Sequence, residues 1–475
     1  MAIDFPLDFT DDNPLFLQIA GGVRAAITTG QVVPGTRLPS ARALAAQLNV
    51  ARGTVDAAYA MLASEGAVDT RGSAGTVVSG AAGIRIEAVE HTPFMFDPDR
   101  ATDRAAPLPL QIGLPALDAF PHKLWSKLTV EVARAAGVAD LTEPDPAGLL
   151  DLRQAVATYL GAARGIRCSA AQVLITAGYQ GALALVRSVL LRPGDPVWTE
   201  DPGYALTRQA LETGGARVVP VRVDRDGLRV ASGIAAAPRA RLAVVTPTHH
   251  FPTCVPLSLP RRQELLAWAG EAGSWILEDD YDSEFRTAGR PLPSLKSLDR
   301  GQRVLYAGSF SKVLFPALRL GYLVVPAELA TAFLRASRLM TRGQPVLQQK
   351  IVAAFMQKGH FVRHIRRMRT LYNQRRRDLA LALQSSFGER ILVEPTAGGL
   401  HLLARFPGAA DDTELVKRAV GVGLAPSALS ASAMAHECGQ GLLLGFTNIP
   451  STNANATDPS ATDANAIVAL LAGVI

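Results

Sequence analysis

The residues with the clearest capacity for chemistry surround one lysine, Lys312. Two serines, Ser309 and Ser311, closely precede it, and Arg319 stands seven residues beyond it. A lysine kept away from water has a lowered pKa and can condense with an aldehyde to form an imine. Two hydroxyls and a guanidinium are the donors that a phosphate dianion needs. A single lysine after a strand is more often a solvated charge, so the interpretation depends on these neighbours.

Three further stretches carry residues that suit the same ligand, and each follows an expected strand. Residues 178–180 begin a helix directly after the apolar run 173–176, and the N–H groups at a helix start can bind phosphate. A sharp turn then places Tyr204 after residues 200–203. The third stretch, EDDYDSEF at 278–285, is rich in carboxylates. By itself such an acidic cluster is more often a solvated loop or a metal site.

The stretch 308–322 resembles the S-x-S-K…R-x-G signature of the fold-type I aminotransferase family, and all four stretches stand in that family's order and spacing. The resemblance implies that pyridoxal 5'-phosphate is bound as an aldimine to Lys312, with Tyr204 stacked on the pyridine ring. It further implies that Asp279 pairs with the protonated ring nitrogen and that Tyr281 bonds the phenolic oxygen. The other cofactor contacts that it implies are Gly178, Tyr179, Gln180, Ser309, Ser311 and Arg319.

The elements that must position these residues divide the chain of 475 residues into three regions. Residues 12–79 are compact and helical and end in a glycine-rich hairpin. Residues 80–106 contain no long periodic run and are predicted to form a linker. Over 107–475, apolar strands alternate with amphipathic helices, which predicts an α/β layered fold. A composition of 48% hydrophobic residues with 41 Gly and 31 Pro suits such a protein.

The first region has the pattern of a winged helix-turn-helix. Helices are predicted over 14–29, after the N-cap Ser40, and over 51–65, followed by a hairpin at 66–78. In this motif the last helix presents its N-terminal residues to base edges, and those residues are Arg52-Gly53-Thr54. The Arg52 guanidinium can reach guanine edges or phosphate, and the Thr54 hydroxyl can bond a phosphate.

The segment 38–78 resembles the DNA-binding domain of GntR-type regulators over its whole length. Ala51 stands where serine is usual and Gly53 where a larger polar residue is usual, which affects sequence preference rather than fold. Residues 1–80 hold five arginines, no lysine and seven acids, a net charge of −2, so global charge does not argue for DNA binding. The alternative is a helical dimerisation or capping domain that never touches DNA. The operator contacts that the resemblance implies are Arg42, Arg52, Thr54 and Gly75.

A GntR-type head on an aminotransferase-type body resembles the architecture of MocR/GabR-type regulators, and this resemblance covers nearly the whole chain. It implies an α+β winged helix-turn-helix head joined to an α/β fold-type I body. It also implies a homodimer whose two heads bind a two-part operator. The expected function is transcription regulation, in which an amine effector or pyridoxal phosphate itself is sensed at Lys312.

Two departures from true aminotransferases favour a sensor over an efficient enzyme. Phe251 occupies the place of an asparagine that bonds the cofactor's phenolic oxygen. Aminotransferases of this fold hold the substrate carboxylate with a late arginine, but after Arg418 this chain contains no arginine or lysine. We therefore hypothesise that the effector is not an ordinary α-amino acid. His250 and Cys254 also depart from the regulators' pattern, in which glutamine and glycine are expected.

Other interpretations stay open at this point. The chain could be a working aminotransferase with an accessory N-terminal domain, or it could keep the fold without the cofactor, although intact Lys312 and Asp279 argue against the latter. The strongly basic segment 360–377 is predicted to be a solvated, partly interdomain helix face, with DNA-backbone contact as the alternative.

The remaining features predict a cytoplasmic protein that is not embedded in a membrane. The N-terminus lacks the charged and apolar regions of a signal peptide, and no apolar run reaches the roughly 18 residues that span a bilayer. The three cysteines lie far apart and match no metal-ligand spacing, so no metal site is expected.

Overall fold

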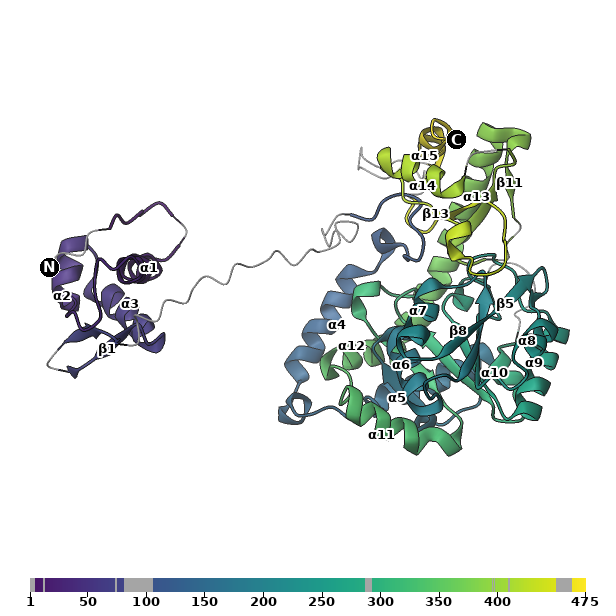
Figure 1. Cartoon of the computed structure of the whole chain (residues 1–475), viewed down its shortest axis with the longest axis horizontal. Coiled ribbons are helices and arrows are strands. Elements are labelled where there is room, and N and C mark those ends of the chain that lie inside the picture. Colours follow the sequence, from purple (N-terminus) through teal and green to yellow (C-terminus); the bar gives the residue numbers. More distant parts are fainter. Residues whose placement is uncertain are drawn as a thin grey trace. The chain divides into compact units, whose positions relative to one another are not determined.

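The structure is a computed structural model, shown in Figure 1. It divides into two compact units, Met1–Arg104 and Ala105–Ile475, here called the head and the body. Of the linker predicted at 80–106, residues 81–105 lie outside the described residues. No helix of the described part combines the length and apolar character needed to cross a membrane. The described residues are 5–11, 13–72, 75–80, 106–286, 293–394, 396, 398–408, 411–449 and 464–475.

The head contains three helices and a hairpin in the order that the sequence predicts. Ser40 caps α2 as expected, because its Oγ accepts a hydrogen bond from the backbone N–H of Ala43 at 3.2 Å. Asn49 ends α2 in the left-handed conformation, with φ 54°. Apolar side chains of the three helices, among them Val23, Leu44 and Val55, form one small core. The elements are α1 (Leu15–Thr28), α2 (Ala41–Leu48), α3 (Arg52–Ser64), β1 (Val68–Thr70) and β2 (Thr76–Val78).

An eight-stranded sheet forms the centre of the body, with the order β3-β10-β9-β8-β7-β4-β5-β6. The strands β9, β8, β7, β4 and β5 are parallel neighbours, and β10 lies antiparallel between β3 and β9. The strands are β3 (Val173–Thr176), β4 (Pro196–Asp201), β5 (Arg217–Asp224), β6 (Gly227–Leu228), β7 (Leu242–Val245), β8 (Trp275–Asp280), β9 (Val304–Ser309) and β10 (Gly321–Val324).

Helices cover both faces of this sheet (Figure 1) because successive apolar residues of each buried strand point to opposite sides. Leu277 of β8 joins the core with α6, α7 and α11, whereas the preceding Ile276 joins the core with α8 and α9. The helices around the sheet are α4 (His122–Ala135), α5 (Leu150–Arg164), α6 (Gly178–Leu190), α7 (Ala205–Thr213), α8 (Val230–Ala236), α9 (Leu259–Ala272), α10 (Leu295–Leu298), α11 (Ala330–Met340) and α12 (Val346–Gln357).

The C-terminal part of the body builds a smaller antiparallel sheet of order β11-β12-β14-β13. The strand β14 is apolar and neutral, and all its residues are buried. These elements are α13 (His360–Phe387), β11 (Leu392–Val393), β12 (His401–Arg405), α14 (Asp412–Gly421), β13 (Ser427–Ala428), β14 (Leu442–Gly445) and α15 (Ala464–Ala472).

The basic segment 360–377 forms the first part of α13, and several of its arginines are used inside the body. Arg375 is buried and pairs with Asp118, and Arg369 donates to the carbonyl of Glu284. Arg376 donates to the carbonyl of Thr396 at 2.6 Å. These contacts favour the structural reading for part of the segment. The arginines that remain exposed on this helix are Arg363, Arg366, Arg367 and Arg377, and Arg369 is exposed as well although its Nε donates to Glu284.

Candidate functional site

The polar residues predicted to act together lie at one edge of the eight-stranded sheet. The strands β4, β7, β8 and β9 run parallel, and β3 runs the same way as β9 because β10 is antiparallel to both. Their carboxyl ends therefore meet along a single edge, where open α/β sheets bind ligands. Thr176, Asp280 and Ser309 are the last residues of β3, β8 and β9.

The close approach of α6 to this edge depends on two glycines. Gly321 pairs with Thr176 on one side and Ser309 on the other, so it stands between the two strand ends. A Cβ on Gly321 would lie 2.8 Å from the carbonyl oxygen of Gly308 and 2.9 Å from the Cα of Gly178. Gly178 itself has φ +68°, a left-handed conformation that favours glycine. Only glycine at these positions lets the N-terminus of α6 reach the sheet edge.

Two of the expected phosphate contacts, Ser309 and Gln180, lie near this helix start. Ser309 ends β9, and its Oγ accepts the backbone N–H of Ser311 at 3.1 Å. Gln180 lies in the first turn of α6, and its Nε2 is buried with no hydrogen-bond partner in the described part of the structure. A buried donor without a partner is costly, and a phosphate oxygen is the kind of acceptor that removes this cost. Arg319 has φ 53° and an exposed side chain, although its charge still acts on Tyr204.

Lys312 follows these serines in a turn and is largely enclosed. Its Nζ donates to the carbonyl oxygen of Gly113 at 2.5 Å. Burial lowers the pKa of Lys312, while the carboxylates of Asp279 and Asp282 partly oppose this by raising it. Because its pKa is lowered, Lys312 loses its proton more readily and becomes a neutral, nucleophilic amine, as expected from the sequence.

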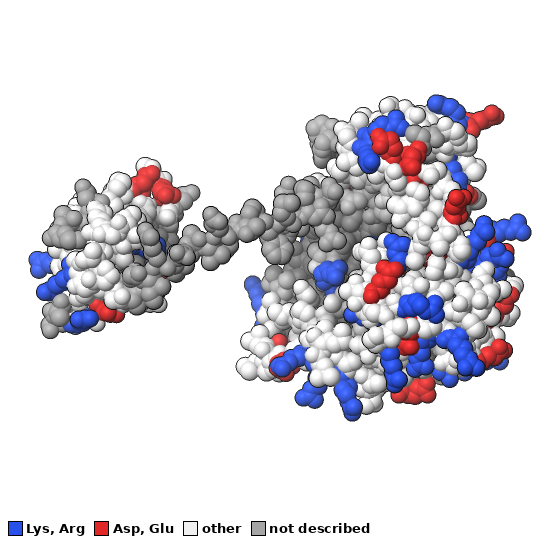
Figure 2. Space-filling view, viewed as in Figure 1, with Lys and Arg blue, Asp and Glu red and all other residues white. Residues whose placement is uncertain are grey.

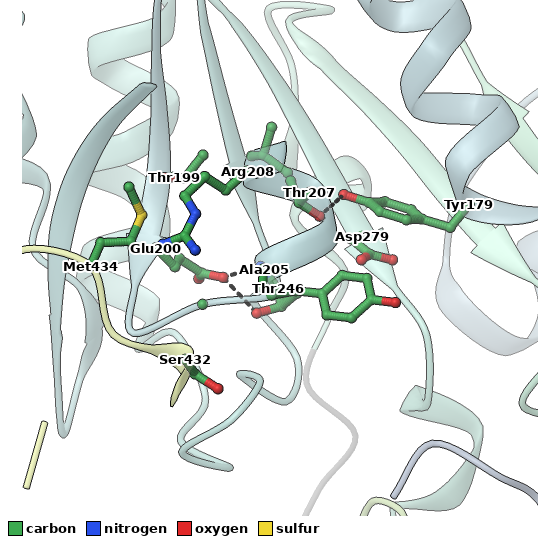
Figure 3. A pocket seen from close by; sticks show the side chains of 13 residues that line it. Tyr179, Thr199, Glu200, Ala205, Thr207, Arg208, Thr246, Asp279, Ser432 and Met434 are labelled. Atoms are coloured by element: carbon green, nitrogen blue, oxygen red, sulfur yellow. Dashed lines mark hydrogen bonds between the residues drawn. The ribbon is translucent and has the colours of Figure 1, made fainter. Parts of the chain in front are cut away.

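Tyr179, Tyr204 and Asp279 line one pocket beside α7, and Figure 3 shows Tyr179 and Asp279 near one another in it. The hydroxyl of Tyr179 is 2.8 Å from Thr207 Oγ1. The ring of Phe251 meets Tyr204 edge to face, with centroids 5.7 Å apart. Burial and the neighbouring carboxylates raise the pKa of Asp279 well above its usual value. A cationic group facing Asp279 would stabilise its charged form.

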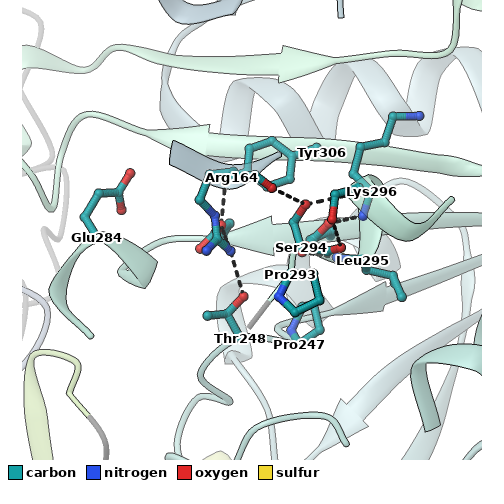
Figure 4. A network of polar contacts seen from close by, with 12 residues as sticks. Arg164, Pro247, Thr248, Glu284, Pro293, Ser294, Leu295, Lys296 and Tyr306 are labelled. Atoms are coloured by element: carbon teal, nitrogen blue, oxygen red, sulfur yellow. Dashed lines mark hydrogen bonds and ion pairs between the residues drawn. The ribbon is translucent and has the colours of Figure 1, made fainter. Parts of the chain in front are cut away.

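The alternation of side chains along β8 separates the three acids at its end. Glu278 and Asp280 face the opposite side from Asp279. Asp280 forms a buried ion pair with Arg164 at 2.7 Å and accepts a hydrogen bond from Tyr306 at 2.6 Å. Figure 4 shows Arg164 and Tyr306 in this network, in which Arg164 also donates to Thr248. Of the three acids, only Asp279 is left to face the pocket.

Glu278 has a structural contact of its own. Its carboxylate accepts the backbone N–H groups of Leu295 at 2.9 Å and Lys296 at 2.7 Å, at the start of α10. Burial raises the pKa of Glu278 to about 7. It therefore anchors α10 rather than serving a ligand in the pocket.

Tyr281 lies directly after β8, where its hydroxyl is 3.2 Å from Nδ1 of His249. The same nitrogen lies 2.7 Å from Asp282. Burial would lower the pKa of His249, but the Asp282 carboxylate raises it well above the usual value. The predicted contact of Tyr281 with the cofactor stays a prediction, and His249 is a neighbour that the sequence analysis did not assign to it.

Two further residues of the pocket were missed by the sequence analysis. Glu200 accepts two hydrogen bonds from Thr246, and burial raises the pKa of Glu200 to about 8. Arg208 stands four residues beyond Tyr204 on α7, and it lines the same pocket (Figure 3). The i,i+4 spacing on a helix was the signal available for Arg208.

Gln440, which stands just before β14, has a structural contact. Its Oε1 accepts the backbone N–H of Asp412 at 2.8 Å, at the start of α14. The nearby Arg405 of β12 pairs with Glu394 at 3.0 Å and donates to the carbonyl of Gln440. Neither side chain lines the pocket of Tyr179 and Asp279.

In the head, the residues predicted to contact DNA lie on the surface. Arg52 begins α3 and forms an exposed i,i+4 pair with Asp56 at 3.3 Å. Arg42 is exposed in the first turn of α2, and Thr54 is half-buried in the first turn of α3. Gly75 has φ +86° in the hairpin turn, and a Cβ there would meet the guanidinium of Arg37 at 2.9 Å. Figure 2 shows basic side chains gathered at one end of the head.

Comparison with known families accounts for both parts of the chain. Residues 15–78 match the bacterial regulatory proteins of the gntR family, and residues 117–426 match aminotransferase class I and II. The probable rhizopine catabolism regulatory protein MocR of Rhizobium meliloti is 34% identical over 93% of this chain and 92% of its own length. The regulator TauR of Rhodobacter capsulatus is 39% identical over 83% of this chain and 85% of its own.

The chain belongs to the MocR/GabR-type transcription regulators. Another member, the pyridoxine biosynthesis regulator PdxR of Corynebacterium glutamicum, is 31% identical over 84% of this chain and 86% of its own. The expected fold is confirmed: a winged helix-turn-helix head and a fold-type I body. The function expected from the sequence, DNA-binding transcription regulation, is the one that these relatives share.

Solved structures similar to the body of this MocR-type protein are aminotransferases. The multiple substrate aminotransferase of Thermococcus profundus has a TM-score of 0.69 at 28% identity, covering 78% of this chain and 92% of its own. LysN, the α-aminoadipate aminotransferase of Thermus thermophilus, has a TM-score of 0.67 at 27% identity, covering 77% and 91%. The body is thus a pyridoxal-phosphate-binding domain.

The residues gathered at the carboxyl ends of these strands fit this cofactor. The buried carboxyl of Asp279 needs a cationic partner, and a protonated pyridine nitrogen is one. The unpartnered Nε2 of Gln180 lies at the helix start where a phosphate would bind. Lys312 carries an enclosed amine with a lowered pKa. These three groups meet the three chemical demands of the cofactor: its ring nitrogen, its phosphate and its aldehyde.

Proposed function

We propose that this MocR-type regulator works in the cytoplasm as a homodimer and senses a small amine, or pyridoxal phosphate itself, through Lys312. The observation that carries the proposal is the enclosed Lys312 amine in a chain that also presents an exposed Arg52 at the start of α3. The cofactor and the DNA contact are thus served by different units of one chain. Two heads per dimer suit a two-part operator.

The chain's own residues hold and orient the cofactor in this proposal. When bound, pyridoxal phosphate supplies an aldehyde that can exchange one amine for another. Lys312 contributes the amine on the protein side, and Asp279 keeps the pyridine nitrogen protonated. Ser309, Ser311 and the first turn of α6 hold the phosphate. Tyr204 covers the ring, with Phe251 packed against its edge.

An effector with both an amine and an anionic group suits the pocket. Arg208 lines the pocket on α7, while β14 provides no guanidinium of the kind that aminotransferases use. The anion that a guanidinium on α7 binds would lie in a different position from the carboxylate that the late arginine of aminotransferases binds. We therefore propose an amine whose anionic group is not an ordinary α-carboxylate, with pyridoxal phosphate as the other candidate.

Titration with candidate effectors tests this proposal. The full chain, loaded with cofactor, is titrated with common α-amino acids, taurine and free pyridoxal phosphate while the visible absorbance of the bound cofactor is followed. We expect a spectral change with taurine, an amine whose anionic group is not an α-carboxylate, or a change in DNA binding with free pyridoxal phosphate. The change should be reduced in Arg208→Gln. Tight binding of a common α-amino acid would contradict the proposal.

A working aminotransferase is the second candidate, and the pairing of Lys312 with Asp279 in one site supports it. Sustained turnover of an amino donor and a keto acid would favour this alternative. We expect binding without sustained turnover, because Phe251 leaves no side-chain amide at the position expected to bond the cofactor.

Replacing Arg52 with alanine should weaken binding of the full chain to DNA from upstream of its own gene. Removing a guanidinium that contacts a base or phosphate costs about 1–3 kcal/mol and lowers the salt dependence of binding by about one charge. Fluorescence anisotropy at several salt concentrations measures both effects. Arg24→Ala is the matched control, because Arg24 also belongs to the head but pairs with Glu65 at 2.8 Å. Equal weakening by both variants would contradict the proposed DNA contact.

The exposed arginines of α13 should not contribute to DNA binding. Replacing Arg366, Arg367 and Arg377 together by alanine is expected to leave the slope of log affinity against log salt unchanged, because these residues occupy a solvated helix face. A slope whose magnitude falls by about two or three units would instead show that this helix face contacts the DNA backbone. The same anisotropy measurement decides between the two.

A further inference from the structure

A second cavity of about 400 Å³ lies outside the pocket of Tyr179 and Asp279. Its walls come from three segments that are far apart in the sequence: residues 248–256 after β7, residues 282–286 after β8, and Thr396, Gly398 and Gly399 before β12. None of the residues assigned to the cofactor lines it. The side chains that matter for its chemistry are His249, Cys254, Ser283 and Arg286.

Two hydrogen-bond donors in the wall of this cavity have no partner among the described residues. Ser283 is 7% exposed, and its Oγ is buried without a hydrogen bond. Nε of Arg286 is also buried without one, and no described carboxylate forms an ion pair with this guanidinium. Buried donors left unpaired cost free energy, and a cation without a counterion favours an anionic ligand. Ser283 and Arg286 together are here called the anion corner.

Asp282, which also lines the cavity, does not cancel the anion corner. Its Oδ2 lies 2.7 Å from Nδ1 of His249. Burial would lower the pKa of His249, but Asp282 and then Cys254 raise it well above its usual value, so the side chain of Asp282 is engaged by this imidazole. Because Asp282 is held by His249, the Arg286 guanidinium has no ion-pair partner among the described residues of this wall.

Cys254 presents a nucleophile to the same cavity. Its Sγ lies 3.4 Å from Nε2 of His401, the first residue of β12. Burial alone would raise the pKa of the Cys254 thiol, but His401 and His249 together lower it to about 6. The pKa of His401 is raised in turn, because the effect of Cys254 outweighs burial. At neutral pH the Cys254 thiol is therefore largely ionised beside the His401 ring, the arrangement that activates cysteine nucleophiles.

The backbone conformation at Cys254 allows a variant that removes the thiol with little effect on the fold. Its φ of +63° lies in the left-handed region, which glycine adopts without strain and other residues rarely adopt. Cys254→Gly should thus remove the thiol without disturbing the loop. A thiol stands at this position although the backbone conformation favours glycine.

We propose that this cavity is a modification site in which the Cys254 thiolate reacts with a small disulfide that carries a carboxylate, held by Arg286 and Ser283. The thiolate sulfur attacks one sulfur of the disulfide, the disulfide's S–S bond breaks, and a mixed disulfide forms on Cys254. The other half leaves as a thiolate and takes a proton from water. The site does not depend on the function proposed above, since it uses neither the cofactor nor DNA.

Modification of the full chain by three small disulfides tests the proposal. Dithiodipropionate is anionic, hydroxyethyl disulfide is neutral and cystamine is cationic, while their arms are similar in length. Mass spectrometry of peptides gives the rate at each cysteine. Cys168 and Cys438 are internal controls, because burial raises the pKa of both thiols. We expect Cys254 to react about fivefold faster than either, after allowing for the weaker nucleophilicity of a low-pKa thiolate.

The anion corner is tested by the choice of disulfide. Arg286→Gln should lower the rate with dithiodipropionate about tenfold relative to the rate with hydroxyethyl disulfide, the effect of losing one charge-assisted contact. Cys254→Gly should show no modification at this position while Cys168 and Cys438 react as before. Thermal unfolding of each variant checks that the body remains folded.

The pH dependence provides a readout that does not require a variant. The groups facing Cys254 are His401 on β12 and His249 after β7, and Asp282 stands behind His249. The rate should rise with a midpoint near the pKa of about 6 and be level through neutral pH. A midpoint near that of an ordinary thiol would overturn the proposal. An unreactive Cys254, or equal relative rates with all three disulfides in wild type and Arg286→Gln, would overturn it as well.

Discussion

Asp280→Asn should lower the free energy of unfolding of this protein by about 3–5 kcal/mol, because it leaves a buried guanidinium without its counterion. The carboxylate of Asp280 and the guanidinium of Arg164 are 2% and 8% exposed and lie 2.7 Å apart. Asp280 also accepts the hydroxyl proton of Tyr306. Urea unfolding of the full chain, followed by a signal from the body, measures the loss.

The neighbouring Asp279→Asn is the matched control and should behave in the opposite way. Burial and nearby carboxylates raise the pKa of Asp279, so its charge opposes folding in the cofactor-free chain. For a carboxyl with a raised folded pKa, stability falls as pH rises above the unfolded value of about 3.9, and a neutral amide avoids this loss. Asp279→Asn should therefore keep or increase stability without cofactor, but weaken cofactor binding. Equal destabilisation by both variants would contradict the opposite roles assigned to these two acids.

The second large effect is expected at Lys312. Borohydride reduction of the cofactor-loaded chain should fix about one cofactor per chain on the peptide that contains Lys312, and Lys312→Ala should abolish this label. Lys296 is an internal control in the same digest, because it is also buried but keeps an ion pair with Asp299 at 3.3 Å. The contact with Asp299 engages the side chain of Lys296, so we expect this lysine to carry no label.

Peptide mapping by mass spectrometry reads the outcome directly. Label on Lys296, or label that survives in Lys312→Ala, would contradict the assignment of the cofactor lysine. Wild type and Lys312→Ala should unfold at similar urea concentrations in the absence of cofactor, which separates lost chemistry from lost folding.

Local patterns in the sequence were enough to predict many elements. The runs 173–176, 242–246 and 275–278 are apolar and end in polar residues, so they were recognisable as buried strands whose ends bear ligands. Ser40 was recognisable as an N-cap because a hydroxyl just before a helical run satisfies free N–H groups there. The strand β10 was harder to place, since nothing local indicates that Gly321 inserts antiparallel between Thr176 and Ser309.

Contacts between distant residues could not be predicted from one sequence. Arg164 and Asp280 come from α5 and β8, and Cys254 and His401 lie 147 residues apart. Each pair depends on how helices and sheets pack, which a local pattern does not specify. That Asp279 faces the opposite side of the sheet from Glu278 and Asp280 could in principle have been predicted, because alternate residues of a strand face opposite sides. That argument needs the strand to extend through Asp280, as the structure shows.

The central claim is that the state of the cofactor in the body changes DNA binding by the head. Anisotropy with DNA from upstream of the chain's own gene tests it most directly, comparing the cofactor-loaded chain, the cofactor-free chain and Lys312→Ala. Coupling between two sites is typically 1–3 kcal/mol, so we predict that loading changes the Kd of the wild type by at least about fivefold. Lys312→Ala should lose most of this response. A Kd that is the same with and without cofactor and effector, in a chain that turns over amino donors steadily, would contradict the claim.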